Sequence, residues 1–235
     1  MTTLAAEIRS LASAQKSSAG VSLYSRFINR PFGRVLAVLA VRARISANTV
    51  SLLSAGVTVV ALVLLILMPP TVFIGLVSAS LLVFGFALDS ADGQVARITD
   101  KSSPAGEWLD HIIDSGKMVA VHGAILVAAF IRFSVPTWWL LVPLCFIFVS
   151  TVMFAGTLLT RFLQPPSVSA ATRKPSLVRA IGLLPADYGI LAVVVTLWGF
   201  HGVFTLVYTG LFAANAVILL MLLAKWSREV SRPAD

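Results

Sequence analysis

Four aspartates stand close together in a chain that is otherwise largely apolar. Asp89 and Asp92 are three positions apart, and Asp110 and Asp114 are four apart. On a helix, either spacing places both side chains on one face. Carboxylates gathered in one place repel each other unless a cation neutralises them, and their oxygens suit hard divalent ions such as Mg²⁺ or Mn²⁺. The spacing therefore predicts a metal site, and two neighbouring ions would suit phosphoryl transfer.

Small and basic residues lie between the two pairs of aspartates. Gly93 lets a ligand approach the backbone, Ala96 keeps the adjoining wall small, and Arg97 offers a guanidinium fork to a phosphate oxygen. Gly106 leaves room at the start of the next helix. The alternative is a set of buried ion pairs with the nearby cations Arg97, Lys101 and Lys117. Three cations do not easily serve four carboxylates, which favours the metal site.

The composition indicates that the elements around these residues are membrane helices. Hydrophobic residues make up 58% of the 235 positions and charged residues only 12%, about half the usual charged fraction of a soluble domain. This composition excludes a soluble α/β enzyme, a disordered tail protein and a nucleic-acid binder. The single cysteine, Cys145, excludes a disulfide framework and a cysteine-based zinc site.

Uncharged runs predict an all-α bundle of six transmembrane helices, preceded by an N-terminal amphipathic juxtamembrane segment. Residues 45–88 carry no charge over 44 positions, too many for one span of about 20 residues, and Pro69-Pro70 divides them. The predicted spans are 49–68, 71–92, 107–132, 133–160 and two segments within 188–224, separated at 199–202. The corresponding domains are a segment at 1–47, a transmembrane domain at 48–227 and a tail at 228–235.

The basic residues predict how the chain is oriented. Arg26, Arg30 and Arg34 recur every four residues among apolar side chains, which is typical of a helix at the membrane surface; the alternative is a basic stretch that only anchors the first span. Most of the 18 Lys and Arg residues lie before the first span, between spans two and three or four and five, or after the last. Only Arg132 lies on the other side. By the positive-inside rule, the chain is a multi-pass protein of the cell (inner) membrane, with both termini and the aspartates on the cytoplasmic side.

The aspartates and their neighbours form a pattern that resembles a known signature. Asp89-x2-Asp92-Gly93-x2-Ala96-Arg97-x8-Gly106-x3-Asp110-x3-Asp114 places eight identities within 26 residues. It resembles the full signature of the CDP-alcohol phosphotransferase (CDP-alcohol phosphatidyltransferase) family of integral membrane enzymes. Residues 45–51 are similar to the family's Thr-Pro-Asn-x-x-Thr segment, with Ala47 replacing the proline and Ser51 the final threonine. Residues 25–30 resemble the amphipathic leader of the branch that includes di-inositol-phosphate-phosphate synthases.

The resemblance implies an activity and assigns roles to residues. It implies metal-dependent transfer of a phosphoryl-alcohol group, as in phospholipid synthesis from CDP-diacylglycerol, to a hydroxyl acceptor with release of CMP. Two Mg²⁺ or Mn²⁺ ions would bind the carboxylates of Asp89, Asp92, Asp110 and Asp114, and Asp114 would be the general base. Contacts with the CDP moiety would come from Gly93, Ala96, Arg97, Gly106, Ser103 and Asn48.

The sequence does not identify the acceptor. A phosphorylated acceptor such as inositol phosphate or glycerol phosphate would need cations near the pocket, and the candidates are Lys117, Arg161, Arg173, Lys174 and Arg179. Alternatively, the cations between spans four and five only set the orientation of the chain in the membrane and do not bind the acceptor. A soluble polyol phosphate is an alternative to a lipid-forming acceptor. A cation transporter is an alternative of another class, but it has no need for the glycines, Ala96 and Arg97 at these offsets.

The sequence also indicates which partners the protein has. The resemblance implies a homodimer, and Gly123, Ala124, Ala128 and Ala129 would allow helices to pack closely. Membrane lipids are expected partners, and nucleic acid is not.

His111 adjoins Asp110 but is expected to point about 100° away around the helix. His122 is expected to form a hydrogen bond inside the bundle.

Overall fold

The computed structural model describes residues 21–163 and 176–231. These residues form helices joined by short turns, and none of them lies in a strand. The all-α prediction is therefore confirmed for the described part of the chain. Arg173 and Lys174, two candidate acceptor cations, lie outside the described residues, as does most of the segment that precedes residue 25.

Five helical segments are long and apolar enough to cross a membrane. They are α3 (Ala47–Leu67), α4 (Val72–Ile98), α5 (Pro104–Arg132), η2 with α6 (Thr137–Leu140 and Leu141–Leu163) and α9 (His201–Val230). The 21 residues of α3 span about 31 Å, which matches a hydrocarbon core about 30 Å thick. For most of these spans, the ends predicted from the uncharged runs lie within a few residues of the observed helix ends.

The remaining predicted span is a shorter apolar helix. Residues Tyr188–Leu197 form α8 (Tyr188–Val194) and the 3₁₀ turn η6 (Val195–Leu197), which pack against α4. Asp187 caps the start of α8, and the chain turns at Gly199, whose backbone lies against Val72. Ten residues rise only about 15 Å, half of the hydrocarbon core. The structure therefore supports five spans and does not confirm the sixth.

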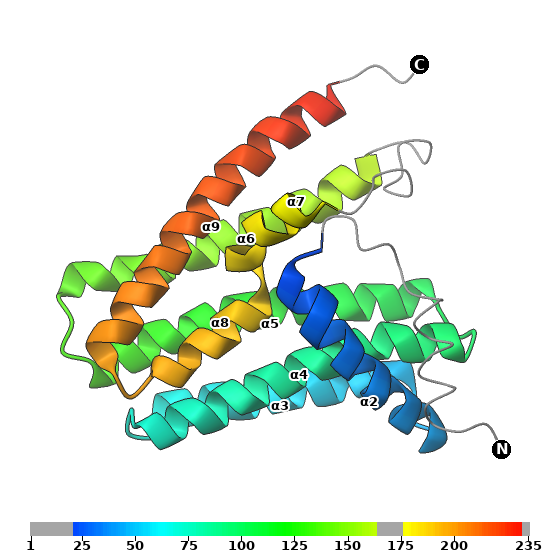
Figure 1. Ribbon diagram of the computed structural model, residues 1–235, viewed down its shortest axis with the longest axis horizontal. Helices are drawn as coiled ribbons and strands as arrows, with labels where there is room; N and C mark the ends of the chain where they lie inside the picture. The colour runs from blue at the N-terminus through cyan, green and yellow to red at the C-terminus, as the bar shows by residue number, and fades with distance from the viewer. Residues whose placement is uncertain (1–20, 164–175, 232–235) are drawn as a thin grey trace.

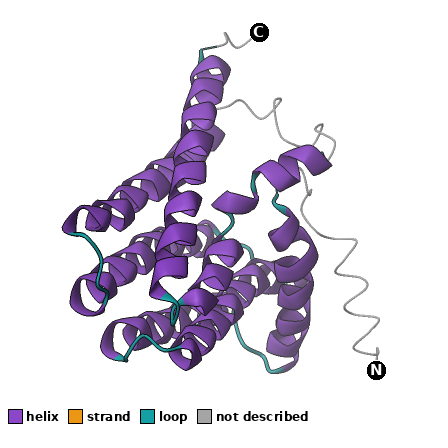
Figure 2. Ribbon diagram, turned by 60° about the vertical axis from the view of Figure 1, so that its left-hand side comes forward, coloured by secondary structure: helices purple, strands orange, loops and turns teal. Residues whose placement is uncertain are grey.

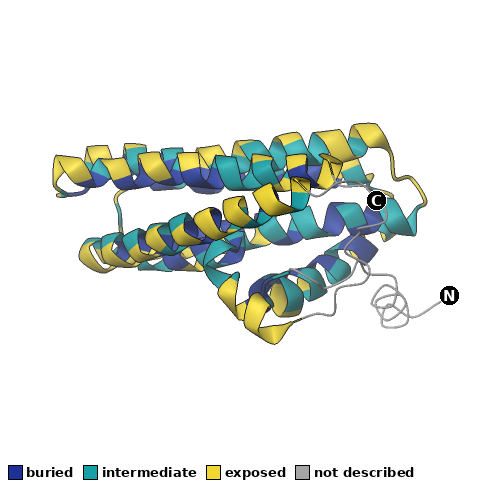
Figure 3. Ribbon diagram, turned by 90° about the horizontal axis from the view of Figure 1, so that it is seen from above, coloured by how far each residue is buried: buried dark blue, intermediate teal, exposed yellow. Residues whose placement is uncertain are grey.

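The turns of the bundle gather at two opposite ends. In Figure 1 the turns at 68–71, 133–136 and 198–200 lie at the left, and those at 43–46 and 99–103 lie at the right, beside α2. Helix α3 packs against α4 and α5, while α6 packs against α5 and α9; Figure 2 shows the same bundle from a second side. Buried positions face the neighbouring helices and exposed ones face outward (Figure 3). Apolar side chains such as Phe130, Phe162 and Leu206 are among those facing outward, as expected of helices in lipid.

The aspartates lie at the end of the bundle where α2 crosses α4. Helix α2 (Arg30–Arg42) follows the single π-helical turn η1 (Ser25–Asn29) and packs on α4. A Cβ on Gly33 would lie 2.9 Å from Ser90 Cβ and 3.1 Å from the Ala87 carbonyl oxygen. The absence of a side chain at Gly33 thus lets α2 lie directly on the turn of α4 that carries Asp89 and Asp92.

The turn between α4 and α5 is built by local backbone chemistry. Asp100 has a left-handed backbone (φ 52°), and the Lys101 amide donates to the Ala96 carbonyl at 2.9 Å, as in a common helix C-terminal motif. Ser103 then caps α5 by accepting from the Gly106 amide at 3.1 Å. Helix α4 ends at Ile98 rather than near position 92. Gly93 therefore lies on the helix directly after Asp92, and Ala96 and Arg97 lie about one turn beyond it.

The small residues of α5 are used inside the bundle. Ala124, Ala128 and Ala129 are buried within the chain itself, and only Gly123 has open space where a side chain would be. The three alanines therefore pack closely against helices of the same chain. The expected homodimer remains a prediction.

Candidate active site

The four aspartates converge from two helices. Asp89 and Asp92 come from α4, and Asp110 and Asp114 come from α5. Carboxylate oxygens of Asp89, Asp92 and Asp110 lie within 4.8 Å of one another. Ligand atoms of Asp110, His111 and Asp114 form a second group within the same limit. Asp110 belongs to both groups, so the two candidate ion positions are adjacent.

Asp92 is held in place by hydrogen bonds. It is buried; the Ser51 hydroxyl of α3 donates to its Oδ2 at 2.5 Å, and the Gly93 amide donates to its Oδ1 at 2.5 Å. Ser51 also lies 3.2 Å from the Ala47 carbonyl oxygen. The role of Ser51 was not expected, although its place at the end of the segment similar to Thr-Pro-Asn-x-x-Thr was a signal that could have suggested it.

Lys117 is part of the aspartate cluster. Its ammonium forms an ion pair with Asp89, donates to Ser54 Oγ at 2.9 Å and lies 3.7 Å from Asp114 Oδ1. Ser54 in turn donates to the Gly85 carbonyl at 2.6 Å. One ammonium compensates one carboxylate, which leaves negative charge for bound cations. Lys117 does not line the pocket described next, so a role in binding the acceptor stays a prediction.

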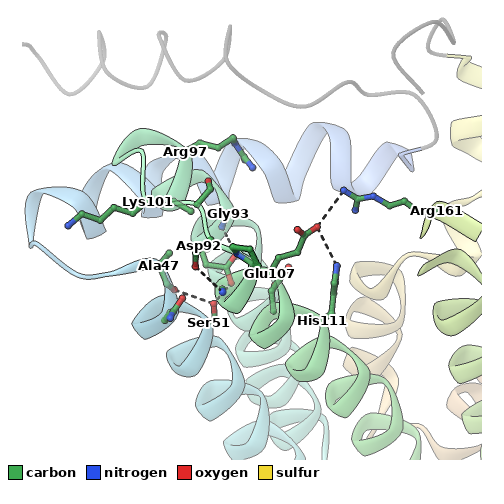
Figure 4. Close-up of a pocket in the computed structure, with 16 residues that line it drawn as sticks. Ala47, Ser51, Asp92, Gly93, Arg97, Lys101, Glu107, His111 and Arg161 are labelled. Atoms are coloured by element: carbon green, nitrogen blue, oxygen red, sulfur yellow. Dashed lines mark hydrogen bonds and ion pairs between the residues drawn. The ribbon is translucent and has the colours of Figure 1, made fainter. Parts of the chain in front are cut away.

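A pocket of about 570 Å³ opens beside the cluster, between α3, α4, α5 and the end of α6. This volume lies within the usual range for small-molecule sites. Figure 4 shows its walls, with Asp92 and Ser51 at one side and Arg161 at the other. The lining residues are Ala47, Asn48, Ser51, Asp92, Gly93, Ala96, Arg97, Lys101, Ser102, Ser103, Pro104, Gly106, Glu107, Asp110, His111 and Arg161.

The pocket unites all the residues expected to contact CDP. Gly93, Ala96, Arg97, Gly106, Ser103 and Asn48 all line it. A Cβ on Gly106 would lie 3.3 Å from both Asn48 Oδ1 and Ser103 Oγ, so any larger residue there would crowd the wall that these side chains form. Ser103 has a structural role in addition, because its hydroxyl caps α5.

The end of α4 and the turn after it contribute cations to the pocket. Arg97 lines the pocket in the last turn of α4, and the exposed Lys101 follows it. Burial, together with the nearby positive charges of Arg97 and Arg26, lowers the pKa of the Arg30 guanidinium on α2. Helix α2 therefore adds positive charge near Arg97, as expected beside a site for phosphates.

The candidate acceptor cations fall into different surroundings. Arg161, at the end of α6, lines the pocket and lies 3.5 Å from Glu107 Oε1 of α5. Arg179 is exposed on α7 (Leu177–Gly182) and is not among the lining residues. Glu107 was not expected at the site, since its position in the first turn of α5 is typical of an ordinary helix start.

The structure confirms the prediction for His122 but not the one for His111. His122 shares a hydrogen bond of 2.7 Å with the Tyr208 hydroxyl inside the bundle, which confirms its expected role. His111 lines the pocket and belongs to the group with Asp110 and Asp114. The expectation that it points away is therefore wrong: the offset around the helix is real, but the ring is long enough to reach back toward the aspartates.

The donor set fits hard divalent cations. Carboxylate oxygens from two helices gather within 4.8 Å, and oxygen ligands of this kind are what Mg²⁺ and Mn²⁺ prefer. Hydrogen bonds to Asp92 fix the orientation of one of them, as is usual around metal ligands. The residues present are thus suited to hold a divalent ion.

Comparison with known proteins identifies the family. The model of the CDP-alcohol phosphatidyltransferase family matches residues 44–184, which is more than half of the 235-residue chain. The match includes α3, α4, α5, α6 and all four aspartates, while α9 lies beyond it. Comparison with curated proteins gives no match. The chain therefore belongs to the CDP-alcohol phosphatidyltransferase family, whose members transfer a phosphoalcohol group from a CDP-alcohol.

Proposed function

We propose that this transferase uses CDP-diacylglycerol as donor and passes its phosphatidyl group to a polar hydroxyl acceptor, releasing CMP in phospholipid synthesis. The observation that carries the proposal is the meeting of the α4 and α5 aspartates beside a pocket at one end of the apolar helices. A site at the membrane boundary receives a lipid donor from the bilayer and a polar acceptor from water.

The donor would bind along the α4 side of the pocket. The guanidinium of Arg97 can donate two parallel N–H bonds to phosphate oxygens, and Gly93, one turn earlier, leaves the backbone open to the nucleotide. Asn48 and Ser103, together with Gly106, form the opposite wall. These positions support CDP binding between the N-terminal ends of α3 and α5 and the C-terminal end of α4.

Asp114 would act as the general base. It accepts the proton of the acceptor hydroxyl, whose oxygen forms a bond to the phosphorus that carries the alcohol. The bond from that phosphorus to the bridging oxygen breaks, and CMP leaves with this oxygen and the electron pair. Two Mg²⁺ or Mn²⁺ ions at Asp89, Asp92, Asp110 and Asp114 would supply positive charge to the diphosphate and the leaving CMP.

The acceptor would enter from the side of α6. Arg161 lines that side, and we include Arg173, Lys174, Arg179 and Lys117 as further candidate contacts for an acceptor phosphate, such as that of inositol phosphate or glycerol phosphate. The excess of cations at this end of the described bundle supports a cytoplasmic site in the cell membrane. A homodimer is proposed from the family alone.

An acceptor screen tests the proposed function. The purified chain is supplied with CDP-diacylglycerol, Mg²⁺ or Mn²⁺, and one of glycerol-3-phosphate, myo-inositol-1-phosphate, inositol or serine, and CMP is measured. We expect CMP release with one of these acceptors. Release only when a CDP-polyol replaces the lipid donor would contradict the lipid assignment in favour of transfer between soluble compounds.

A substitution tests the assigned base. Asp114→Asn keeps the shape of the side chain but removes its ability to take a proton, so we expect CMP release to fall at least about 100-fold. Asp100→Asn, in the exposed turn after α4, is the matched control and should keep activity. Metal-dependent CMP release at the wild-type rate in Asp114→Asn would eliminate Asp114 as the base.

A further inference from the structure

His111 has the surroundings of a metal ligand. Both of its ring nitrogens are inaccessible to solvent, and neither has a hydrogen-bond partner among the described residues. Leaving buried polar atoms unpaired is costly. The ring nevertheless lies in the wall of the pocket, within 4.8 Å of carboxylate oxygens of Asp110 and Asp114. A cation held by those aspartates would satisfy one of the unpaired nitrogens.

The side chains behind the ring suit such a role. Glu107 Oε1 lies 3.8 Å from His111 Nε2, and Arg161 holds the same carboxylate oxygen at 3.5 Å; Figure 4 shows Glu107 between the two. Metal-binding histidines usually donate their second ring N–H to a carboxylate, which fixes the orientation of the ring. With Nε2 toward Glu107, Nδ1 is left for the ion. Phe154 of α6 flanks the ring, with centroids 6.3 Å apart.

We propose that His111 is a metal ligand and that the two ion positions therefore differ. This inference rests on the proposed function, because it adds a ligand to the metal site assumed there. The position at Asp89, Asp92 and Asp110 has oxygen ligands only and suits Mg²⁺. The position at Asp110, His111 and Asp114 adds an imidazole, which favours Mn²⁺ or a later transition metal over Mg²⁺. The enzyme would thus hold Mn²⁺ beside Asp114 even where Mg²⁺ occupies the other position.

Pulsed electron paramagnetic resonance of bound Mn²⁺ tests the inference without an activity assay. The full chain, purified with a tag that contains no histidine, is titrated with Mn²⁺ alone and measured for ¹⁴N modulation from a coordinated imidazole. The chain has only three histidines; His122 is bonded to Tyr208, and His201 lies near Pro70 at the opposite end of the bundle. Growth on ¹⁵N-histidine should change the nitrogen signal without altering any side chain.

Two variants assign the signal to one residue. We expect His111→Gln to lose the imidazole signal and to weaken Mn²⁺ binding at one position at least about tenfold. His201→Gln is the matched control and should keep both signal and affinity. Bound Mn²⁺ without an imidazole signal in the wild-type chain would overturn the inference and leave the proposed function standing. A chain that binds no Mn²⁺ would overturn the inference, and also the proposed metal dependence if Mg²⁺ fails to support CMP release.

Discussion

At the scale of single residues, the site depends on side chains that orient or compensate the aspartates. Ser51 donates to Asp92, and Lys117 pairs with Asp89. The ion pair of Lys117 is part of the alternative that the sequence offered. The Ser51 contact does not follow from the aspartate spacing, because Ser51 lies 41 positions before Asp92. The spacing located the carboxylates and the nearby Lys117, whereas the partnership with Ser51 required the packing of α3 against α4.

Removing the Ser51 hydroxyl should weaken the site. In Ser51→Ala, Asp92 loses a charge-assisted hydrogen bond, so we expect metal affinity or CMP release to fall about 10- to 100-fold. Ser51→Thr keeps the hydroxyl and should restore most of the activity. Ser80→Ala, whose hydroxyl bonds only the Leu76 carbonyl on the exposed face of α4, is the control. Equal activity of Ser51→Ala and the wild type would contradict the role given to this serine.

Lys117 should make the cluster less dependent on metal for stability. In Lys117→Met the carboxylates lose their ammonium partner, so we expect a lower melting temperature without divalent ions and a larger increase when Mn²⁺ is added. Thermal unfolding in detergent with and without Mn²⁺ measures both. Lys225→Met removes a cation paired with Glu229 on α9 and should leave the metal effect unchanged. A Mn²⁺ effect no larger in Lys117→Met than in wild type would show that the ammonium does not compensate the cluster.

At the scale of the helices, close packing of α3 and α4 positions the aspartates. Gly85 lies one turn before Asp89, and a Cβ there would lie 2.9 Å from Thr58 Oγ1 and 3.3 Å from the Ser54 carbonyl oxygen. The long apolar runs predicted these helices well, because an uncharged run in lipid has few alternatives to a helix. They did not predict the end of α4 or the short α8, since both depend on local turns and caps.

A larger residue at Gly85 should separate the helices that carry the site. We expect Gly85→Leu to cost about 1–3 kcal/mol in stability through overpacking and to reduce CMP release by more than tenfold. Gly56 of α3 has no heavy atom within 4 Å of its Cβ position, so Gly56→Leu is the matched control and should behave as wild type. Full activity in Gly85→Leu would contradict the importance of this close contact.

The hydrogen bonds that join the N-terminal part of the described chain to the start of α8 could not be predicted from the sequence. Asp187, at the start of α8, accepts hydrogen bonds from Ser22, from Ser25 at 2.6 Å and from the Gly189 amide at 2.8 Å. The serines precede it by more than 160 positions, and nothing in their local pattern marks them as partners. The sequence indicated that Asp187 lies at a helix start, but it did not indicate the hydrogen-bond partners of this side chain.

At the scale of the whole molecule, the charge distribution separates the two ends. Among the described residues, Arg132 is the one Lys or Arg at the end opposite the site, where Arg132 donates to the carbonyls of Ile66 and Leu67. Arg42 ends α2 beside the site, and the neighbouring turns carry Arg44 and Lys101. This asymmetry was visible in the sequence because it depends on composition between spans and not on packing.

The asymmetry predicts which turns face the cytoplasm. After Cys145→Ser removes the native cysteine, Ser134→Cys and Ser231→Cys each place one thiol at an exposed position at opposite ends of the bundle. We expect a membrane-impermeant maleimide to label Ser134→Cys in intact cells and Ser231→Cys only after permeabilisation. The reverse pattern would place the active site on the outer side.

The central claim is that the phosphorus next to the alcohol moves to the acceptor and that CMP leaves. CDP-diacylglycerol labelled with ³²P at that phosphorus, incubated with the purified chain, a divalent ion and the acceptor that supports CMP release, tests this directly. We predict that the label enters the new phosphodiester, that one unlabelled CMP appears for each product, and that chelation of the metal stops both. Label recovered in CDP, or the same turnover after Asp92→Asn, would contradict the account.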